Sequence, residues 1–281
     1  MSERCCEVSK AFLLGLTAML ASTQAPRSFH KDRVSFQSGT LTLVGYLYRP
    51  EGPGPFPAVL WNHGSEGNPG AGPQFDSVAA IFVPAGYAVF APVRRGHGGS
   101  QGNYIVDSTA AEARQHGFAA GRRLAARLLE TEQLDDQLAG LTFLKQQAFV
   151  DTMRLVVAGC SYGGIQTLLG AERHVGYRAA VPISPAALSW ATSPELQERL
   201  QQAAGRITIP VLLIQPPRDP SLEPAHVLGP LLEKANPRSR TKVYPVEGPD
   251  DQQGHCFGGA KGMHRWASDV LAFLHEILGT P

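Results

Sequence analysis

Ser161 lies between Gly159 and Gly163, where the apolar run "RLVVAG" meets "YGGIQTLLG", which has the apolar spacing of a helix. A nucleophilic serine must stand clear of its own backbone while backbone N–H groups stay close, and a sharp strand-to-helix turn achieves this. Such a turn leaves room only for very small residues two positions before and after the serine. The pattern therefore predicts a nucleophile at a helix N-terminus, whose dipole favours a developing oxyanion.

A nucleophilic serine hydroxyl needs a base, and a histidine base needs a carboxylate to orient it. The histidines that follow the serine with a strand between are His226, His255, His264 and His275. We predict His255 as the base because it lies in "GPDDQQGHCFGG", a glycine-rich loop between the last predicted strand and the last helix. His226 is expected to begin a helix, and the other two histidines to lie in the final helix.

For the orienting carboxylate, Asp219 follows the apolar strand "PVLLIQ" by four residues, in the loop position that this chemistry requires. Glu223 is the alternative. Asp250 and Asp251 lie in the same loop as the predicted base and are expected to be solvated. Cys160 falls outside the frame of the two glycines, so Cys160→Ala is predicted to retain most of the activity.

An oxyanion needs two backbone N–H donors, and Tyr162 supplies the first as the residue after the nucleophile. The segment "LWNHGSEG" ends another predicted strand, and the N–H of Ser65 is the expected second donor. His63 is expected to hold the shape of this loop by hydrogen bonding. Trp61 and Trp190 are candidates for lining the substrate pocket.

The elements that must position these residues follow a regular order. "RVSFQSGTLTLVGYLYRP" predicts two antiparallel strands around a Ser38–Gly39 turn, and strands then alternate with helices from residue 58 onward. The later strands are short and nearly all apolar, as a sheet covered on both faces requires. The prediction is an α/β fold with a mostly parallel sheet of about eight strands. Residues 33–281 form one domain in this interpretation.

Composition excludes several other classes of function. The formal net charge is +1 and no run of Lys or Arg occurs, so no nucleic-acid partner is indicated. The four cysteines are too few for a disulfide framework and fit no zinc pattern. No metal or organic cofactor is implied, and the sequence leaves the oligomeric state open.

Residues 1–32 are predicted to form an N-terminal arm or a signal segment. The stretch Ala11–Ala21 has the length of the apolar core of a signal peptide and is too short to span a bilayer, so no stable membrane insertion is expected. The segment before it carries both acidic and basic residues. Both a cytoplasmic and an exported location stay open.

Five segments in this order resemble the α/β-hydrolase superfamily, and within it the dienelactone hydrolase-like and prolyl-oligopeptidase-like serine esterases. They are "NHGSEGNPG", "RRGHGGSQG", "GCSYGG", "LLIQPPRDP" and "GHCFGG", and the resemblance covers about residues 33–278. It implies an α/β-hydrolase fold and a bracing role for Arg95, Gly96 and Gly98 beside the His-Gly loop. True dienelactone hydrolases carry cysteine at the nucleophile position, where this chain has Ser161.

The sequence therefore predicts a serine esterase that cleaves short acyl esters through Ser161, Asp219 and His255 and an acyl-enzyme. A small peptidase or amidase, or a lactone hydrolase, is the alternative within the same chemistry. A non-catalytic binding protein with the same fold is the alternative of another class. No large cap domain is expected, and the helical region between residues 102 and 150 is expected to cover the site.

Overall fold

The structure is a computed structural model that describes residues 29–247 and 254–281. The expectations for the N-terminal apolar segment lie outside the described residues. So do those for Asp250 and Asp251.

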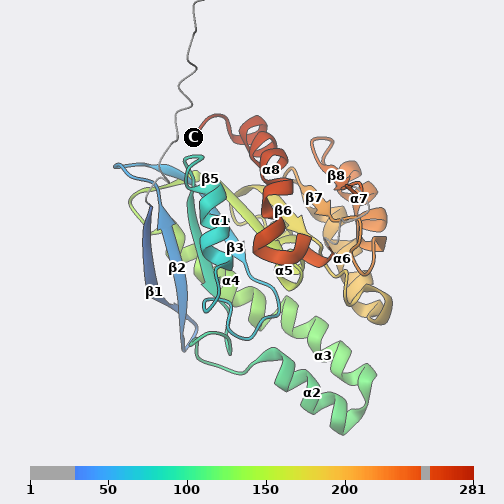
Figure 1. Cartoon of the computed structure of the whole chain (residues 1–281). Coiled ribbons are helices and arrows are strands. Elements are labelled where there is room, and N and C mark those ends of the chain that lie inside the picture. The colour runs from blue at the N-terminus through green and yellow to red at the C-terminus, as the bar shows by residue number, and fades with distance from the viewer. Residues whose placement is uncertain (1–28, 248–253) are drawn as a thin grey trace, which may run out of the picture.

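A single eight-stranded sheet runs through the domain in the order β1-β2-β4-β3-β5-β6-β7-β8, which confirms the predicted sheet (Figure 1). β1 and β2 form an antiparallel hairpin, β2 pairs antiparallel with β4, and the remaining neighbours are parallel. The strands are β1 (His30–Ser38), β2 (Leu41–Arg49), β3 (Phe56–Asn62), β4 (Ala88–Val93), β5 (Val150–Cys160), β6 (Tyr177–Ile183), β7 (Leu212–Gln215) and β8 (Arg240–Val243). The first strand thus begins three residues before the predicted domain start.

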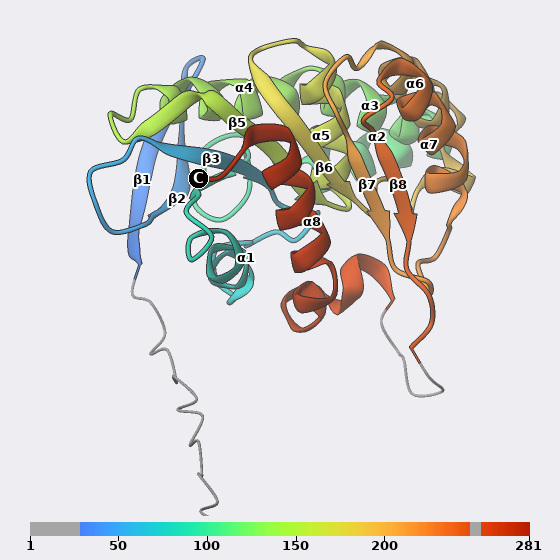
Figure 2. The ribbon, with the colours of Figure 1, turned by 90° about the horizontal axis from the view of Figure 1, so that it is seen from above.

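Helices cover both faces of this sheet (Figure 2). α1 and α8 lie on one face, and α4, α5, α6 and α7 lie on the other. The α-helices are α1 (Gln74–Phe82), α2 (Ile105–His116), α3 (Phe118–Glu130), α4 (Glu132–Lys145), α5 (Tyr162–Glu172), α6 (Pro194–Arg206), α7 (Glu223–Ala235) and α8 (Met263–Leu278). Two 3-10 segments, η1 (Trp190–Thr192) and η2 (His255–Gly262), lie in the loops after β6 and β8.

The alternation of side chains in β3 shows how one strand serves two hydrophobic cores. Ala58 and Leu60 pack into the core on the side of α4 and α5, whereas Val59 and Trp61 pack into the core beneath α1 and α8. All four side chains are at most 1% exposed. Successive residues of a strand point to opposite faces, so an almost wholly apolar strand is needed where both faces are covered.

The helical region predicted to cover the site divides into two parts with different packing. α4 is a core helix that buries Leu134, Leu141 and Leu144 against the sheet. α2 and α3 form a hairpin that projects from the body of the domain (Figure 1). α2 buries Ile105 alone, and Phe118 at the hairpin turn is 83% exposed.

No helix within residues 29–247 or 254–281 combines the length and the hydropathy needed to cross a membrane.

Candidate active site

Ser161 occupies the tight turn between β5 and α5 with a φ of 61° and a ψ of −119°. Such a backbone conformation is unfavourable for a residue with a side chain and persists only where neighbouring contacts impose it. The N–H of Ser161 donates to the carbonyl of Ile183 on β6 at 3.0 Å, and its own carbonyl accepts from the N–H of Ile165 at 3.1 Å. The strained residue is thus fixed to the neighbouring strand and to the first turn of α5.

The two flanking glycines face the carbonyl oxygen of Asn62 at the end of β3. A Cβ atom on Gly159 would lie 2.5 Å from that oxygen, and a Cβ atom on Gly163 would overlap it. The crowding expected around the turn is therefore present, and its source is the backbone of the neighbouring strand rather than a movable side chain.

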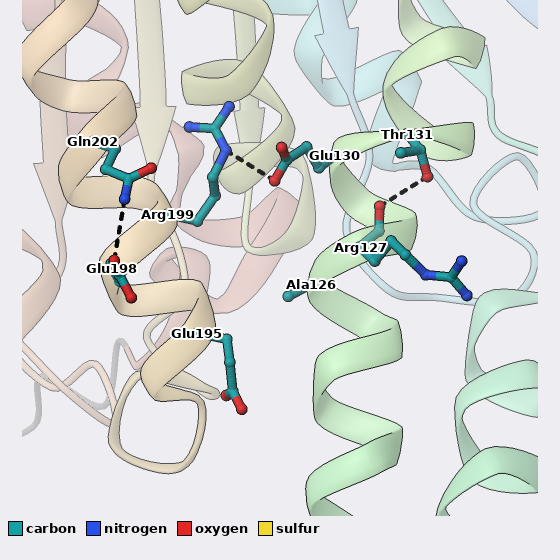
Figure 3. A pocket seen from close by; sticks show the side chains of 8 residues that line it. All are labelled: Ala126, Arg127, Glu130, Thr131, Glu195, Glu198, Arg199 and Gln202. Atoms are coloured by element: carbon teal, nitrogen blue, oxygen red, sulfur yellow. Dashed lines mark hydrogen bonds and ion pairs between the residues drawn. The ribbon is translucent and has the colours of Figure 1, made fainter.

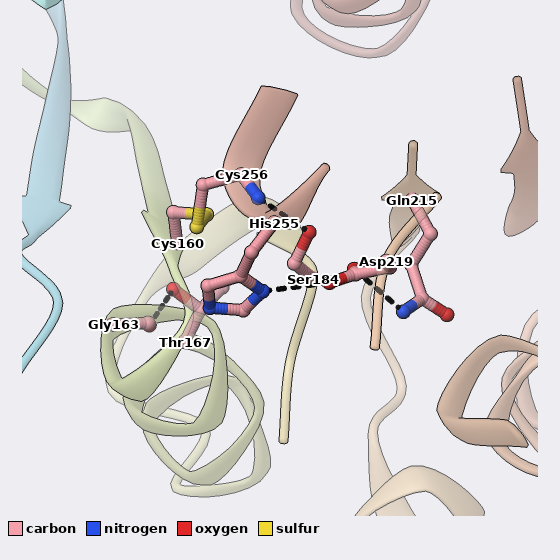
Figure 4. Close-up of a disulfide and its surroundings, with 8 residues drawn as sticks. All are labelled: Cys160, Gly163, Thr167, Ser184, Gln215, Asp219, His255 and Cys256. Atoms are coloured by element: carbon pink, nitrogen blue, oxygen red, sulfur yellow. Dashed lines mark hydrogen bonds and ion pairs between the residues drawn. A yellow bond between two sulfur atoms is a disulfide. The ribbon is translucent and has the colours of Figure 1, made fainter. Parts of the chain in front are cut away.

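His255 and Asp219 are hydrogen bonded to each other, as Figure 4 shows. Nδ1 of His255 lies 2.6 Å from Oδ1 of Asp219, whose side chain is fully buried. Because a carboxylate only accepts, Nδ1 carries the proton, and Nε2 of the neutral imidazole is left as the basic nitrogen. Nε2 is buried and has no hydrogen-bond partner among the described residues. It is thus not bonded to Ser161, a contact that is often long before substrate binds.

Gln215 orients the carboxylate from the other side. Its side-chain Nε2 donates to Oδ2 of Asp219 at 2.9 Å and to the carbonyl of Ser221 at 3.0 Å, while its Oε1 accepts from the N–H of Ala225 at 3.0 Å. Gln215 is fully buried at the end of β7. The acid is therefore held in one orientation by a side chain that is itself fixed at both ends.

A disulfide links the nucleophile turn to the loop of the candidate base. Cys160 immediately precedes Ser161, Cys256 immediately follows His255, and the two cysteines are bonded with their Cα atoms 6.0 Å apart (Figure 4). The sequence analysis treated the cysteines as too few for a framework and missed this bond. It also brings the backbones of the candidate nucleophile and base together, although they are far apart in the sequence.

The loop after β3, residues 62–70, is called the oxyanion loop here because it contains Ser65. Its backbone is held by a fully buried guanidinium: Arg94 donates to the carbonyls of His63 at 2.7 Å and Gly64 at 2.6 Å. Nε of Arg94 also donates to the side chain of Gln133 at 3.1 Å. Ser65 follows directly, and its carbonyl accepts from the hydroxyl of Tyr104 at 2.9 Å.

Two buried histidines complete this arrangement. His63 donates from Nδ1 to the carbonyl of Gly64 at 2.9 Å and accepts the backbone N–H of Arg94 on Nε2 at 3.1 Å, so it holds the loop as expected. Its ring meets that of His97 edge-on at 4.9 Å. Burial, with Arg94 nearby, lowers the pKa of His63 well below its usual value and lowers that of His97 to about 4. Both rings are thus neutral at neutral pH.

Arg94 itself remains charged although it is enclosed. Burial lowers its pKa to about 10, and the nearby carboxylates of Glu66 and Asp136 partly offset this effect. A cation that stays charged beside the carbonyls of His63 and Gly64 keeps strong donors on the oxyanion loop at neutral pH.

The bracing role that the resemblance assigned to Arg95 belongs to its neighbour. Arg95 instead binds Asp136 on α4, with its backbone N–H and Nε each 2.9 Å from Oδ2 and its Nη2 2.7 Å from Oδ1. Arg94 reaches the oxyanion loop because adjacent residues at the end of a strand point to opposite sides. Gly98 does contribute, since its N–H donates to the carbonyl of Gly67 at 3.0 Å, and Gly96 closes a turn with Gln101.

The two tryptophans predicted to line the pocket lie in the cores instead. Trp61 is 1% exposed and stacks on Trp266 of α8 with ring centroids 6.2 Å apart, on the face of the sheet that α1 and α8 cover. Trp190 is 5% exposed and packs into the core beneath α6. The side-chain alternation of β3 turns the ring of Trp61 inward, and the turn after β6 does the same for Trp190.

The remaining candidates lie away from this arrangement. Glu223 begins α7 and faces His226 at 3.8 Å, with both side chains exposed. His264 is exposed at the start of α8 and contacts the carbonyl of Lys261, and His275 lies in the last turn of the same helix. No group of three or more His, Cys, Asp or Glu is placed to hold a metal ion within the described ranges.

A polar groove of about 410 Å³ lies between α3 and α6 (Figure 3). Within it Arg199 donates to Glu130 at 2.9 Å, and the same guanidinium binds Glu172 of α5. None of the candidate catalytic residues lines it. The residues around it are Ala126, Arg127, Glu130, Thr131, Glu195, Glu198, Arg199 and Gln202.

Sequence reasoning missed three contributions, each of which had a signal. Gln215 is the one polar residue that ends the apolar strand before the candidate acid. Each cysteine of the disulfide is adjacent in the sequence to a predicted catalytic residue. For Arg94 the signal was ambiguous, since two arginines stand side by side and only the fold decides which one turns toward the oxyanion loop.

Comparison with known proteins shows what the chain is similar to. Residues 73–202 match the prolyl oligopeptidase family. The structure is similar to that of the Pyrococcus furiosus esterase Pf2001, with a TM-score of 0.67 and 20% identity over 89% of this chain and 94% of that one.

Two further structures agree. The acylaminoacyl peptidase of Pyrococcus horikoshii matches with a TM-score of 0.64 and 18% identity, over 90% of this chain and 42% of its own. Est1E from Butyrivibrio proteoclasticus, solved with ferulic acid bound, matches with a TM-score of 0.65 and 18% identity over 87% and 99% of the two chains. These matches confirm the predicted α/β-hydrolase fold.

Proposed function

We propose that this chain, which has the α/β-hydrolase fold, is a serine hydrolase that cleaves carboxylic esters with Ser161 as nucleophile, His255 as base and Asp219 as the orienting acid. The observation that carries the proposal is the 2.6 Å hydrogen bond between His255 and the buried carboxylate of Asp219. The disulfide joins the loop that carries His255 to the strained turn that bears Ser161.

In the proposed first half-reaction, Oγ of Ser161 attacks the ester carbonyl carbon while its proton passes to Nε2 of His255. The carbonyl oxygen gains the negative charge and accepts hydrogen bonds from the N–H groups of Ser65 and Tyr162. Tyr162 is the first residue of α5, where helix N–H groups lack partners within the helix and the dipole favours an anion. Asp219 stabilises the imidazolium.

Collapse of this intermediate breaks the bond to the alcohol, which leaves with the proton from His255. A water molecule then gives its proton to the same nitrogen and attacks the acyl carbon. Loss of the serine oxygen releases the carboxylic acid and returns the proton to Ser161. Arg94 takes no part in the bond changes, but it fixes the carbonyls of His63 and Gly64, the two residues directly before Ser65.

Small acyl esters are the substrates that this surface supports best. The oxyanion loop contributes Ser65, Glu66, Gly67 and Asn68, which are polar or lack a side chain. The large exposed apolar residues among those described lie on separate elements, so they form no broad surface for a lipid. These residues are Val106, Phe118, Met153, Leu188 and Val246.

A peptidase or amidase is the second candidate, favoured by the match of residues 73–202 to the prolyl oligopeptidase family and by the likeness to an acylaminoacyl peptidase. An amide needs the same nucleophile but a stronger proton donor for its poor leaving group. The two candidates therefore share the triad and differ in substrate.

The triad is tested by Ser161→Ala. We expect kcat on p-nitrophenyl acetate to fall by several orders of magnitude while circular dichroism stays that of the parent, as removal of a triad nucleophile does elsewhere. A fluorophosphonate should label Ser161 in the parent, with fluoride as leaving group, and leave the variant unlabelled. Failure to label an otherwise folded parent would favour the non-catalytic binding protein.

The substrate class is tested by kcat/KM for p-nitrophenyl esters from C2 to C16, beside aminoacyl and dipeptidyl anilides. The expected maximum lies at short acyl chains. A maximum at C12 or longer would indicate a lipase, and anilide turnover equal to that of the best ester would indicate a peptidase. Methyl ferulate belongs in the series because Est1E was solved with ferulic acid.

A further inference from the structure

The Cys160–Cys256 disulfide joins two parts of the chain with very different support. Cys160 ends β5, which pairs with β3 and β6 along the centre of the sheet, and it is 5% exposed. Cys256 lies in the segment after β8, here called the His255 loop and defined as residues 254–262. The bond therefore fastens this loop to the end of a central strand that is paired on both sides.

The His255 loop has a backbone that needs external support. Four successive residues have positive φ: Cys256 at 53°, Phe257 at 57°, Gly258 at 71° and Gly259 at 69°. Two of them carry a Cβ atom, for which the left-handed region is unfavourable. The residue that immediately precedes this run is His255, so any relaxation of the run moves the imidazole.

Three contacts oppose that relaxation. The ring of Phe257 is fully buried and meets Tyr244 edge-on at 5.0 Å. The N–H of Cys256 donates to Oγ of Ser184 at 3.3 Å, and the disulfide provides the third contact (Figure 4). Within residues 29–247 and 254–281, the disulfide is the one covalent bond that joins the loop to the turn that carries Ser161. The hydrogen bond to Asp219 orients the imidazole. The distance between the imidazole and Ser161 depends instead on the position of the loop backbone.

We propose that the Cys160–Cys256 disulfide is a positioning element that sets His255 against Ser161, so that the enzyme is fully active only with this bond formed. The inference rests on the proposed function, since it concerns the base of that triad. Reduction by a dithiol transfers two electrons and two protons to the sulfurs, gives two thiols and closes the dithiol to its own disulfide. It also reverses the sequence-based expectation that Cys160 is dispensable.

The test compares oxidised and dithiothreitol-reduced protein on p-nitrophenyl acetate, at a temperature where circular dichroism shows both forms folded. We expect kcat to fall by about 10- to 100-fold on reduction, the effect of a small misplacement of a catalytic group, while KM changes little. Reoxidation should restore kcat. An unchanged kcat in the reduced, folded protein would overturn the inference.

Two variants serve as controls. Cys160→Ala combined with Cys256→Ala should have the kcat of the reduced parent and no response to dithiothreitol. Cys5→Ser combined with Cys6→Ser removes the two remaining cysteines and should respond like the parent. If the response to dithiothreitol disappears in Cys5→Ser combined with Cys6→Ser, the redox effect arises from those two cysteines, and the proposal is contradicted.

A second readout separates this inference from the proposed function. The proton shared by His255 and Asp219 should give a downfield NMR signal in the oxidised protein. This signal should weaken or broaden when the disulfide is reduced at a temperature below the thermal unfolding midpoint. A disulfide that serves stability alone would leave the signal unchanged. An oxidised protein that shows the signal but neither hydrolyses esters nor reacts with a fluorophosphonate would contradict the proposed function while leaving the positioning role testable by the signal.

Discussion

The oxyanion loop and the His255 loop both take part in the proposed chemistry at Ser161, but they are held by different kinds of bonds. The oxyanion loop is held without covalent links, by the buried guanidinium of Arg94 on two of its carbonyls and by the neutral ring of His63. The His255 loop is held by a disulfide, by the buried ring of Phe257 and by one hydrogen bond to Ser184. One loop therefore depends on charge, and the other depends on the redox state of two sulfurs.

The difference follows from what each loop must present. The oxyanion loop offers a backbone N–H, so its carbonyls and amides must be fixed individually, which only hydrogen bonds can do. The His255 loop offers a side chain whose orientation Asp219 already sets, so what remains is to fix the position of the backbone. A covalent link to the neighbouring strand is enough for that purpose.

The largest expected effect concerns the charge behind His255. Asp219→Asn should lower kcat by about 10⁴, because the amide would donate to Nδ1 and force the proton onto Nε2, where the base must be free. Gln215 would then face a second amide. The measurement is kcat on p-nitrophenyl acetate, with Asp151→Asn as a control, since that carboxylate pairs with Arg154 away from the site.

Retention of more than about a tenth of the parent kcat in Asp219→Asn would contradict the role of this carboxylate. The His255 loop would then have to orient its imidazole by the position of its backbone alone, without the carboxylate.

The next effect separates the two adjacent arginines. Arg94→Met should lower kcat/KM by about 10²- to 10³-fold, the range seen when oxyanion stabilisation is lost, because the carbonyls of His63 and Gly64 would no longer be fixed. Arg95→Met should instead lower the free energy of unfolding by about 3–5 kcal/mol, since it leaves the buried carboxylate of Asp136 without its cation. Activity and chemical unfolding are measured for both variants.

Arg95→Met is the matched control, because it removes the same side chain one residue away. An equal loss of kcat/KM in the two variants would mean that both arginines act through general stability, and the oxyanion loop would not depend on one particular charge.

The smallest expected effect is on stability against pH. The pKa of His97 is lowered by burial and by Arg94 to about 4 from a usual 6.5, while hydrogen bonds to the backbone of Arg95 and Arg94 and the charge of Asp136 act in the opposite direction. The unfolded chain therefore binds more protons between these values, so this contribution to stability is present above pH 6.5 and is lost as the pH falls toward 4. The slope is at most about 1.4 kcal/mol per pH unit for each histidine.

We expect His97→Phe to reduce the fall in unfolding free energy between pH 6.5 and pH 4, compared with the parent, in denaturant titrations at several pH values. The difference between the two proteins isolates His97 from the carboxylates that also titrate in this range. Identical slopes in parent and variant would show that the buried ring does not couple the oxyanion loop to pH.

Much of the fold could be predicted because the strands are almost wholly apolar and alternate with helices that have clear apolar spacing. The nucleophile turn was also accessible, since a tight turn imposes glycine at Gly159 and Gly163 whatever the rest of the fold does. The candidate base and acid followed from their places in loops after strands. Local steric demands of this kind are recorded directly in the order of residue types.

The rest depended on three-dimensional relations that residue types alone do not record. Which of Arg94 and Arg95 faces the oxyanion loop depends on the side to which each points at the end of β4, and Trp61 faces the α8 core for the same reason of parity. The pairing of Cys160 with Cys256 needed only the adjacency of each to a predicted catalytic residue. That adjacency was visible, but a count of cysteines in the whole chain obscured it.

The α2–α3 hairpin has a consequence for how proteins of this design can diversify. It enters after the turn that follows β4, leaves into α4, and turns back at Gly117, with few buried side chains of its own along α2. Surface segments of this kind tolerate insertion and replacement because little of the core depends on them. The hairpin can therefore be lengthened, trimmed or exchanged in descendants of this chain while the sheet and the proposed catalytic residues are inherited unchanged.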